Sequence, residues 1–371
     1  MKEGWEYKTL EEVCNINYGT RVVQKKDKGT TYYVYGGGGA TFMIDRYNRE
    51  DCFIVSRFAM SPKCTRFVKG KFFLNDSGLS VSTNHDNLNQ RYLDRALLAN
   101  NDNIYSMGKG LAQRNLDMPS FRKLVIPIPP LAEQERIVAE LDLLSSIIEK
   151  KKAQLKELDQ LAQSIFYDMF GDPITNEKGW EVKKLKDSVQ EMFLGPFGSA
   201  LKVSCYVPES DAFAMVYEQK HAIQGTLEME NHFINKEKFD SLSRFEVKPK
   251  DFIMSCRGTI GRIFQLPENA PKGIIHPSLM KIRIKDEVYG YTFFVFLLKK
   301  IIAEQTTKGN CVQMAITAKE LGNMDFPLPP LPLQQEFADK VEAIERQKSL
   351  IQQSIVETQT LFDSRMDYWL G

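Results

Sequence analysis

The sequence predicts an α+β protein in which two mixed α/β segments are separated by two long antiparallel helices, a coiled coil, with a pseudo-two-fold internal repeat. Three observations predict this fold. Several short stretches occur twice, two long stretches carry a heptad pattern, and the segments between them mix β-rich and helical runs. The chain of 371 residues is long enough for two globular segments and a further element.

The internal repeat is visible at the edges of the globular segments. Most matched stretches lie 200 residues apart, and the opening stretch lies 175 residues from its copy. The matched pairs are Gly4–Leu10 with Gly179–Leu185, Asp51–Arg57 with Asp251–Arg257, and Ile126–Leu131 with Phe326–Leu331. The interiors do not match, since Tyr32–Gly39 and Gly195–Ser199 have no counterparts. A common frame therefore carries two different inserts, which favours related modules with different specificities.

A helix of about forty residues, roughly 60 Å long at 1.5 Å per residue, is expected after Pro129 and Pro130, because no Gly or Pro follows until Gly171. Its apolar residues recur at spacings of three, four and seven, as in a heptad seam. They are Ile137, Leu141, Leu144, Ile148, Leu155, Leu158, Ala162, Ile165 and Met169. The second copy carries Phe337, Val341, Ile344, Ile351, Ile355, Phe362 and Trp369.

Each apolar stripe needs a partner, and the simplest partner is the other copy, which pseudo-two-fold symmetry would place antiparallel. The symmetry is expected to be imperfect. Lys348 and Arg365 occupy the second stripe where the first has Ile148 and Ile165. We interpret Lys150–Lys152 as a solvated face of the first helix.

The two globular segments are expected to mix strands with helices, because short Phe-, Val- and Ile-rich runs alternate with longer helical ones. The expected strands are Asp51–Phe58, Lys71–Leu74, Asp251–Ser255 and Lys281–Ile284, and the expected helices are Gln90–Ala99 and Tyr291–Glu304.

Polar loops at matched positions are the candidate binding sites. The loop Cys256–Arg262 follows an expected strand and contains two glycines, which let the backbone approach a ligand closely. Arg, Lys, Asn and Gln are the side chains that contact phosphates and base edges. A Gly-Arg turn at a strand end is commonly a plain surface turn, so the prediction depends on recurrence in both halves. The candidate residues for DNA binding are Tyr35, Gly37, Arg57, Lys63, Arg66, Lys109, Gln113, Arg114, Ser199, Lys202, Arg257, Thr259, Arg262, Lys308, Asn310 and Gln313.

Composition excludes several classes of protein. The six cysteines form no C-x-x-C pair and there are four histidines, so a zinc site is not expected, and scattered cysteines are typical of a reduced, cytoplasmic protein. The first residues lack the apolar region of a signal peptide, and the apolar run Tyr291–Leu298 is too short to span a membrane. The net charge of +1 does not show the basic excess of many DNA-binding proteins, although a basic face can be balanced elsewhere.

Motifs for catalysis are not found. The sequence contains no G-x-x-x-x-G-K-[ST] phosphate loop and no H-E-x-x-H. The Pro-Pro turns Ile128–Leu131 and Leu328–Leu331 lack the polar first residue and the aromatic last residue of an amino-methyltransferase turn. The run Tyr35–Gly39 faintly resembles a glycine-rich cofactor turn, although such a run is more commonly a flexible or DNA-apposed loop.

Over nearly its whole length the chain resembles the specificity subunits of type I restriction-modification systems. The resemblance is carried by the repeated Gly-Trp-Glu openings and the Pro-Pro-Leu-x-x-Gln turns before the long helices. Further carriers are the run at the join and three runs in the second half. These stretches are Pro129–Gln134, Pro329–Gln334 with Pro332 inserted, Ser164–Pro173, Gly195–Ser199, Asp251–Gly261 and Ile274–Leu279.

The resemblance implies a division into four parts. Residues 1–128 would form target recognition domain 1, residues 129–172 a central helical spacer, residues 173–328 target recognition domain 2, and residues 329–371 a C-terminal helical spacer. Each recognition domain would bind one half of a bipartite site in double-stranded DNA. The helices would set the spacing and dock the modification (methyltransferase) subunits.

The resemblance further implies that the chain is not catalytic alone and needs no cofactor. S-adenosylmethionine would bind to the modification subunits, and ATP and Mg²⁺ would be used by restriction (translocase/nuclease) subunits. Base-reading residues vary within this family, so the candidate residues above depend on the loop argument alone. Two alternatives stay open: a free-standing DNA methyltransferase with a cofactor turn at Tyr35–Gly39, and a coiled-coil protein–protein adaptor that does not contact DNA.

Overall fold

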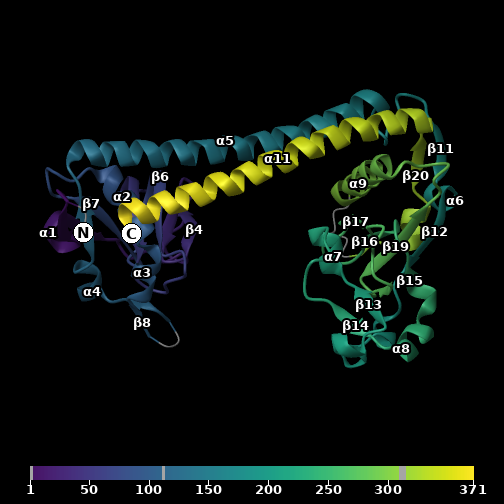
Figure 1. The fold of residues 1–371 in the computed structure, drawn as a ribbon, viewed down its shortest axis with the longest axis horizontal. Coiled ribbons are helices and arrows are strands. Elements are labelled where there is room, and N and C mark those ends of the chain that lie inside the picture. The colour runs from purple at the N-terminus through teal and green to yellow at the C-terminus, as the bar shows by residue number, and fades with distance from the viewer. Residues whose placement is uncertain (1–2, 111–112, 309–314) are drawn as a thin grey trace. The chain divides into compact units, whose positions relative to one another are not determined.

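The computed structural model describes residues 3–110, 113–308 and 315–371 (Figure 1). The chain forms two compact units. Unit 1 comprises Met1–Leu155 together with Leu350–Gly371, and unit 2 comprises Lys156–Ser349. Each unit therefore combines a globular part with about half of each long helix.

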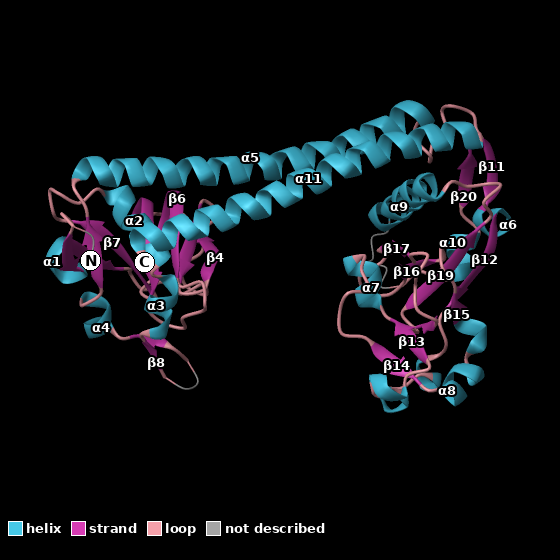
Figure 2. Ribbon diagram, in the orientation of Figure 1, coloured by secondary structure: helices cyan, strands magenta, loops and turns pink. Residues whose placement is uncertain are grey.

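Unit 1 is built on a six-stranded sheet covered by helix α2 (Gln90–Ala99), which packs against β6 and β7 (Figure 2). The strand order is β2 (Cys14–Tyr18), β7 (Gly78–Thr83), β5 (Arg49–Ser56), β6 (Thr65–Leu74), β3 (Tyr32–Gly36) and β4 (Gly39–Ile44). Neighbouring strands are antiparallel except β3 and β6, which are parallel. Helix α2 begins after Asn89, whose side chain accepts from two backbone N–H groups and caps the helix.

The remaining elements of unit 1 connect this sheet to the long helices. They are β1 (Glu6–Thr9), α1 (Leu10–Val13), α3 (Asn101–Ser106), β8 (Gly108–Lys109), β9 (Asn115–Leu116), α4 (Met118–Arg122) and β10 (Val125–Ile128). Strand β1 pairs antiparallel with β10, the strand that leads into the first long helix. The opening stretch of the repeat is thus held beside the helix start.

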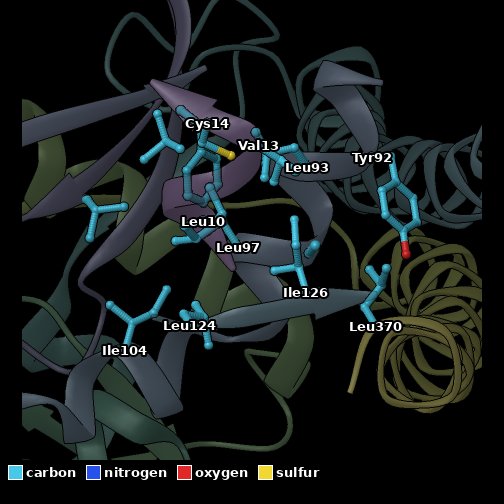
Figure 3. Packing of buried hydrophobic residues seen from close by; sticks show 14 of the residues in the cluster. Leu10, Val13, Cys14, Tyr92, Leu93, Leu97, Ile104, Leu124, Ile126 and Leu370 are labelled. Carbon is cyan, nitrogen blue, oxygen red and sulfur yellow. The ribbon is translucent and has the colours of Figure 1, made fainter. Parts of the chain in front are cut away.

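The core of unit 1 includes side chains from the end of the chain. Leu370 is 1% exposed and lies with Tyr92 and Ile126 in one apolar cluster (Figure 3). Trp369 stacks on Trp5 with ring centroids 6.4 Å apart. The last helical turn is therefore part of the N-terminal globular core.

Unit 2 contains two four-stranded sheets in place of one larger sheet. Their orders are β12 (Val189–Leu194), β19 (Leu279–Ile284), β16 (Phe252–Ser255), β17 (Ile263–Gln265), and β14 (His232–Ile234), β13 (Ala214–Tyr217), β18 (Gly273–Ile275), β15 (Glu246–Val247). Strands β13 and β18 are parallel, so their carboxyl ends meet at one edge of the second sheet.

Helices and a short strand pair complete unit 2. They are β11 (Glu181–Lys184) paired with β20 (Asp325–Leu328), α6 (Leu185–Ser188), α7 (Gln219–Gln224), α8 (Lys236–Ser241), α9 (Tyr291–Lys308), α10 (Ala318–Gly322), and the 3₁₀ turns η1 (Gly198–Ala200), η2 (Val203–Cys205), η3 (Glu209–Asp211) and η4 (Ser243–Phe245). The core is rich in aromatic rings: Phe166 of the first long helix contacts Phe293 of α9 and Phe337 of the second.

The long helices are α5 (Leu131–Phe170) and α11 (Leu331–Leu370), each of 40 residues. Within each unit they contact one another in antiparallel order. In unit 1 Arg365 pairs with Glu140 at 2.9 Å, and in unit 2 Lys348 pairs with Asp159 at 2.8 Å. The predicted stripe residues are all buried or half-buried. The antiparallel helical partner predicted from the heptads is confirmed.

The polar residues on the second stripe have acidic partners on α5. Lys348 and Arg365, which break the match with Ile148 and Ile165, form the two ion pairs just described. Their charges are thereby compensated at the helix–helix contact, and the repeat keeps its packing although the two stripes differ in chemistry.

The interpretation of Lys150–Lys152 as a wholly solvated face is wrong at one position. Lys151 is half-buried and donates to the hydroxyl groups of Ser354 and, at 3.2 Å, Thr358. Lys151 lies within the seven-residue interval between Ile148 and Leu155 in the apolar stripe. A polar residue therefore occupies this position of the heptad pattern. Buried polar contacts of this kind specify register in helix pairs.

The repeated Pro-Pro-Leu-x-x-Gln turn has a structural function. Gln134 and Gln334 are both fully buried at the first turns of α5 and α11. The Gln334 side chain accepts from Gly290 N at 2.8 Å and donates to Val288 O and Pro329 O at 3.0 and 2.7 Å. Gln134 accepts from Asn89 N and donates to the carbonyls of Asn87 and Pro129 in the same pattern. Each glutamine joins a long helix to the loop before α2 or α9.

Candidate nucleic-acid interface

An arginine lies just after each of the matched strands β5 and β16. The same backbone contact recurs at Arg57 itself in unit 1 and at Cys256, the residue before Arg257, in unit 2. Leu116 N donates to Arg57 O at 2.8 Å in unit 1, and Ile316 N donates to Cys256 O at 2.9 Å in unit 2. In unit 2 Arg257 also forms a β-bridge with Ala315. We define the unit 1 arginine corner as residues 57–66 with 108–110 and 113–116, and the unit 2 arginine corner as residues 256–262 with 315–316.

Arg57 lies against two aromatic rings. Its guanidinium carbon is 4.7 Å from the centroid of Tyr18 and 4.4 Å from that of Phe58. Both distances fall within the range of cation–π attraction, which is strongest where the cation is partly desolvated. Arg57 is half-buried, and Tyr18 is 43% exposed at the end of β2. The guanidinium is therefore held at the surface by rings from two neighbouring segments.

In unit 2 a left-handed glycine turn presents the candidate side chains. Gly258 and Gly261 have φ values of 66° and 79°, which residues with a Cβ rarely adopt. Ser255 fixes the turn, because its hydroxyl donates to Thr259 O and accepts from Arg262 N at 3.0 Å.

The three candidates of this turn, Arg257, Thr259 and Arg262, are all exposed. Gln219 Nε2 donates to Arg257 O at 2.8 Å and ties the corner to the start of α7. The turn is thus fixed through its backbone, and these side chains stay accessible to a ligand.

Three basic candidates in unit 1 have intramolecular partners. Arg66 donates to Lys63 O at 2.7 Å, Arg114 stacks on Tyr105 and donates to Gly108 O at 3.2 Å, and Lys109 pairs with Asp117 at 2.9 Å. These contacts shape the loops of the arginine corner. Lys63 and Gln113 are exposed.

The glycine-rich turn between β3 and β4 packs against its own chain. Gly37 is buried, and a Cβ placed on it would lie 2.1 Å from Phe58 O. Ser56 Oγ donates to Gly37 O at 2.6 Å. Tyr35 is half-buried and lies edge-on to Phe72 at 5.3 Å. Close packing therefore accounts for these two candidates, and their contact with DNA stays a prediction.

The run Gly195–Ser199 lies beside Ile274–Leu279, another stretch that carries the family resemblance. A Cβ on Gly195 would be 2.2 Å from His276 O, so this backbone approach requires glycine. Phe197 is 88% exposed, and Ser199 and Lys202 are exposed as well. Two stretches about 80 residues apart in sequence are thus in backbone contact in unit 2.

The other candidates of unit 2 are described only in part. Lys308 is the last residue of α9. Its side chain, together with Asn310 and Gln313, lies outside the residues that the structure describes. Their assignment to the interface stays a prediction.

A polar cluster at the end of β13 was not predicted. Glu218 Oε2 lies 2.8 Å from His232 Nδ1 and 3.0 Å from Lys220 Nζ, and Tyr206 stacks on His232. Burial alone would raise the pKa of Glu218, but hydrogen bonds from Lys220 and His232 outweigh it and hold the pKa below its ordinary value. The residues are scattered along the sequence, and no motif signals them.

A hollow of about 490 Å³ lies beside the unit 2 arginine corner and is lined in part by Thr259, Arg262 and Lys299. Burial lowers the pKa of Lys299, and the neighbouring Arg262 charge lowers it further. Lys299 was also missed, because nothing in the sequence links its helix α9 to the glycine turn. The hollow adds a cationic side chain next to the glycine turn.

Within residues 3–110, 113–308 and 315–371, none of the helices has the length and apolar character of a membrane span. The same ranges contain no group of three or more His, Cys, Asp or Glu side chains placed to hold a metal ion.

The model of the type I restriction modification DNA specificity domain matches residues 2–160 and again residues 177–359. The chain belongs to this DNA specificity domain family. The two matches correspond to the two copies of the repeat, and each copy contains one arginine corner.

Two relatives of the DNA specificity domain family are named specificity subunits. The putative type I restriction enzyme MjaX specificity subunit of Methanocaldococcus jannaschii is 24% identical over 68% of this chain and 60% of its own length. The type I restriction enzyme EcoBI specificity subunit of Escherichia coli is 22% identical over 73% of this chain and 62% of its own length. The chain spans about three fifths of the length of these curated relatives.

Solved structures share the fold along almost the whole chain. A type I restriction-modification S subunit from M. genitalium gives a TM-score of 0.55 at 15% identity, covering 98% of this chain and 95% of that one. A chain from a structural study of the assembly and conformational transition of the type I R-M system gives 0.65 at 18% identity, covering 100% and 98%. These similarities establish the architecture of the DNA specificity domain family for this chain.

Proposed function

We propose that this protein is the DNA-binding specificity subunit of a type I restriction-modification enzyme and is not catalytic alone. Units 1 and 2 each bind one half of a bipartite target in double-stranded DNA. The long helices set the spacing between the half-sites and dock modification subunits. The chain itself needs no cofactor: S-adenosylmethionine binds to the partner modification subunits, and the restriction subunits use ATP and Mg²⁺. The protein is located in the cytoplasm.

The observation that carries this proposal is the pair of arginine corners. The same backbone contact recurs in both units at Arg57 and Cys256, while the surrounding loops and sheets differ. A duplicated backbone framework that presents different side chains is suited to two units that recognise different DNA sequences. Two such readers in one chain bind as a bivalent ligand, for which the linker determines the permitted separation.

Two observations disfavour the alternatives. Packing of Gly37 against Phe58 leaves the Tyr35–Gly39 turn without the open backbone of a cofactor loop, which weakens the methyltransferase alternative. The exposed cations Arg257 and Arg262 on a fixed turn are not explained by an adaptor that acts through its helices alone.

Exchanging residues 176–325 for the equivalent segment of another specificity subunit tests the proposal. Methylated adenines are then mapped in the host genome with the modification subunits present. We expect one half of the target to change while the other half is retained. Arg257→Ala should relax the same half or weaken its binding, and an unchanged methylation pattern in both experiments would contradict the proposal.

A further inference from the structure

Among the candidate cations of unit 1, Arg57 combines a fixed position with a free guanidinium. Arg66 and Arg114 donate to backbone carbonyls, and Lys109 is paired with Asp117. The Arg57 guanidinium has its two aromatic neighbours but no hydrogen-bond acceptor or acidic partner among the residues that the structure describes. Its donors are therefore available to a ligand.

The backbone that carries Arg57 is fixed on both sides. Arg57 N donates to Ser77 O at 2.8 Å, and Arg57 O accepts from Leu116 N at 2.8 Å. The next residue, Phe58, donates its N–H to the same Ser77 carbonyl at 3.2 Å. The side chain thus starts from a rigid point at the end of β5.

The backbone segments that carry the two rings in contact with the guanidinium are fixed as well. Tyr18 is paired with Leu79 in the β2–β7 ladder, and Phe58 O packs tightly against Gly37. A guanidinium held against two aromatic rings loses less additional side-chain freedom on binding than a free one. The edge of the guanidinium plane carries its N–H donors.

We propose that Arg57 reads a guanine in the half-site bound by unit 1, an inference that rests on the proposed function. A guanidinium donates two parallel hydrogen bonds to guanine O6 and N7 in the major groove, and this pair distinguishes G·C from the other base pairs. The contact needs two donors in one plane, which the guanidinium supplies, and the rings at Arg57 restrict its position.

A backbone phosphate is the competing acceptor, and the corner supplies a better candidate for it. Lys63 is exposed, has no ion-pair partner among the described side chains, and carries a flexible point charge. Phosphate contacts need charge more than orientation, whereas base recognition needs both. We therefore expect Arg57 to recognise a base and Lys63 to attract the phosphates of the DNA backbone.

The test selects binding sites for the full chain from a random-sequence duplex library, using wild type, Arg57→Lys, Arg57→Gln and Lys63→Ala. We expect the wild type to enrich a bipartite target with a fixed guanine in one half. Both Arg57 variants should lose preference at that one position and bind the wild-type target about 10- to 100-fold more weakly. The other half should be unaffected.

Lys63→Ala is the matched control for charge. We expect it to weaken binding to all selected sequences and to reduce the salt dependence of binding, with no change of base preference. Tyr18→Phe keeps the ring and should behave as wild type, whereas Tyr18→Ala removes one stacking face and should relax the same guanine position.

A second measurement uses the wild-type chain, so it does not depend on the folding of any variant. 7-Deazaguanine, which lacks the N7 acceptor, replaces each guanine of the half-site that survives exchange of residues 176–325. One replacement should weaken binding by about 10-fold or more.

The outcomes separate the two proposals. If Arg57→Gln retains the full sequence preference, or if no 7-deazaguanine replacement in that half weakens binding, Arg57 does not read guanine although DNA recognition stands. If the wild type enriches no sequence, the proposed function itself is overturned and the guanine inference with it.

Discussion

At the scale of single residues, three arginines of the unit 1 corner carry the same charge but have different neighbours. Arg66 and Arg114 donate to main-chain carbonyls and hold loops in place. Arg57 stacks on two rings and keeps its donors free. The availability of a cation to a ligand is therefore decided by its local hydrogen bonds and not by residue type.

Gly37 provides a direct test of the close-packing account. Gly37→Ala should lower the free energy of unfolding by about 3 kcal/mol or more, because its Cβ would overlap Phe58 O. Gly38→Ala is the matched control, since a Cβ there has nothing within 4 Å. The control should be neutral or stabilising by up to about 1 kcal/mol.

Chemical denaturation measures both glycine variants. A Gly37→Ala protein with wild-type stability but weakened DNA binding would show that this glycine faces the ligand and not its own fold.

Asp94 gives the fold a pH dependence. Burial raises the pKa of Asp94 to about 6, although a hydrogen bond from Gln90 and the charges of Arg95 and Arg91 oppose the shift. The folded protein therefore binds this proton more tightly than the unfolded chain. Stability contributed by this site is largest below the unfolded pKa and is lost as the pH rises through about 6.

Asp94→Asn should remove the free-energy cost of holding an ionised carboxylate at this buried position. We expect the free energy of unfolding to rise by about 1–2 kcal/mol at about pH 7.5, with the gain shrinking at about pH 4. Asp86→Asn, an exposed carboxylate, is the control and should change little at either pH. An equal gain at both pH values would exclude the carboxylate as its source.

The candidate residues could be predicted only in part from sequence. Strand-end arginines were visible because they recur at an offset of 200 residues. The stacking partner Tyr18 lies on β2, and nothing in the sequence links it to Arg57. The cluster around Glu218 was invisible for the same reason, since tertiary contacts between dissimilar residues leave no spacing pattern.

At the scale of elements, the start of each long helix is fixed by one buried amide. Gln134 and Gln334 make equivalent sets of three backbone hydrogen bonds. A buried amide so placed cannot be removed without leaving its backbone partners unpaired. The Pro-Pro-Leu-x-x-Gln motif therefore acts as a joint between helix and globular part.

Gln334→Ala should lower the free energy of unfolding of unit 2 by about 3 kcal/mol or more, because Gly290 N, Val288 O and Pro329 O lose their partner. Gln335→Ala on the exposed face is the control and should stay within about 0.5 kcal/mol of wild type. Equal stability of the two variants would show that water replaces the amide.

The helices were the most predictable elements. Pro-Pro before the heptads and Gly after them bracket Leu131–Phe170 and Leu331–Leu370, and the spacing of apolar residues identifies the buried face. Lys151 was assigned to solvent because the residue is charged, although its heptad position predicts contact with α11. A long lysine stem packs along apolar surface while its ammonium reaches the hydroxyl groups of α11.

At the scale of the molecule, the proposed ruler can be tested by shortening both helices together. Removing 148–154 from α5 and 351–357 from α11 deletes one heptad from each and removes Lys151 together with its partner Ser354. The helices become shorter by about 10 Å, so the spacer between half-sites should shorten by about three base pairs.

Deleting 148–154 alone is the control, because it shifts α5 against α11 and should destabilise the protein without giving a new defined spacer. If methylation mapping shows an unaltered spacer after the paired deletion, the long helices do not set the spacing between the half-sites.

The duplication could be predicted at this scale, but the construction of the units could not. Both copies share the strand pair at the helix start and the 40-residue helix. The sequences of the two copies are similar in these shared elements. Unit 1 has a six-stranded sheet and unit 2 has two four-stranded sheets. The interiors diverge in sequence, so comparison of the copies gave no information on their strand order.

The burial of Leu370 in the core of unit 1 determines the order in which a nascent chain matures. Unit 2 is one continuous segment, Lys156–Ser349, and has its full set of residues before α11 is complete. Unit 1 lacks Met366 and Leu370 until the ribosome has added them, although its first 155 residues emerge earliest. We therefore expect residues 1–155, although translated before unit 2, to reach their native packing after it, because their apolar cluster is complete only when Met366 and Leu370 have been added.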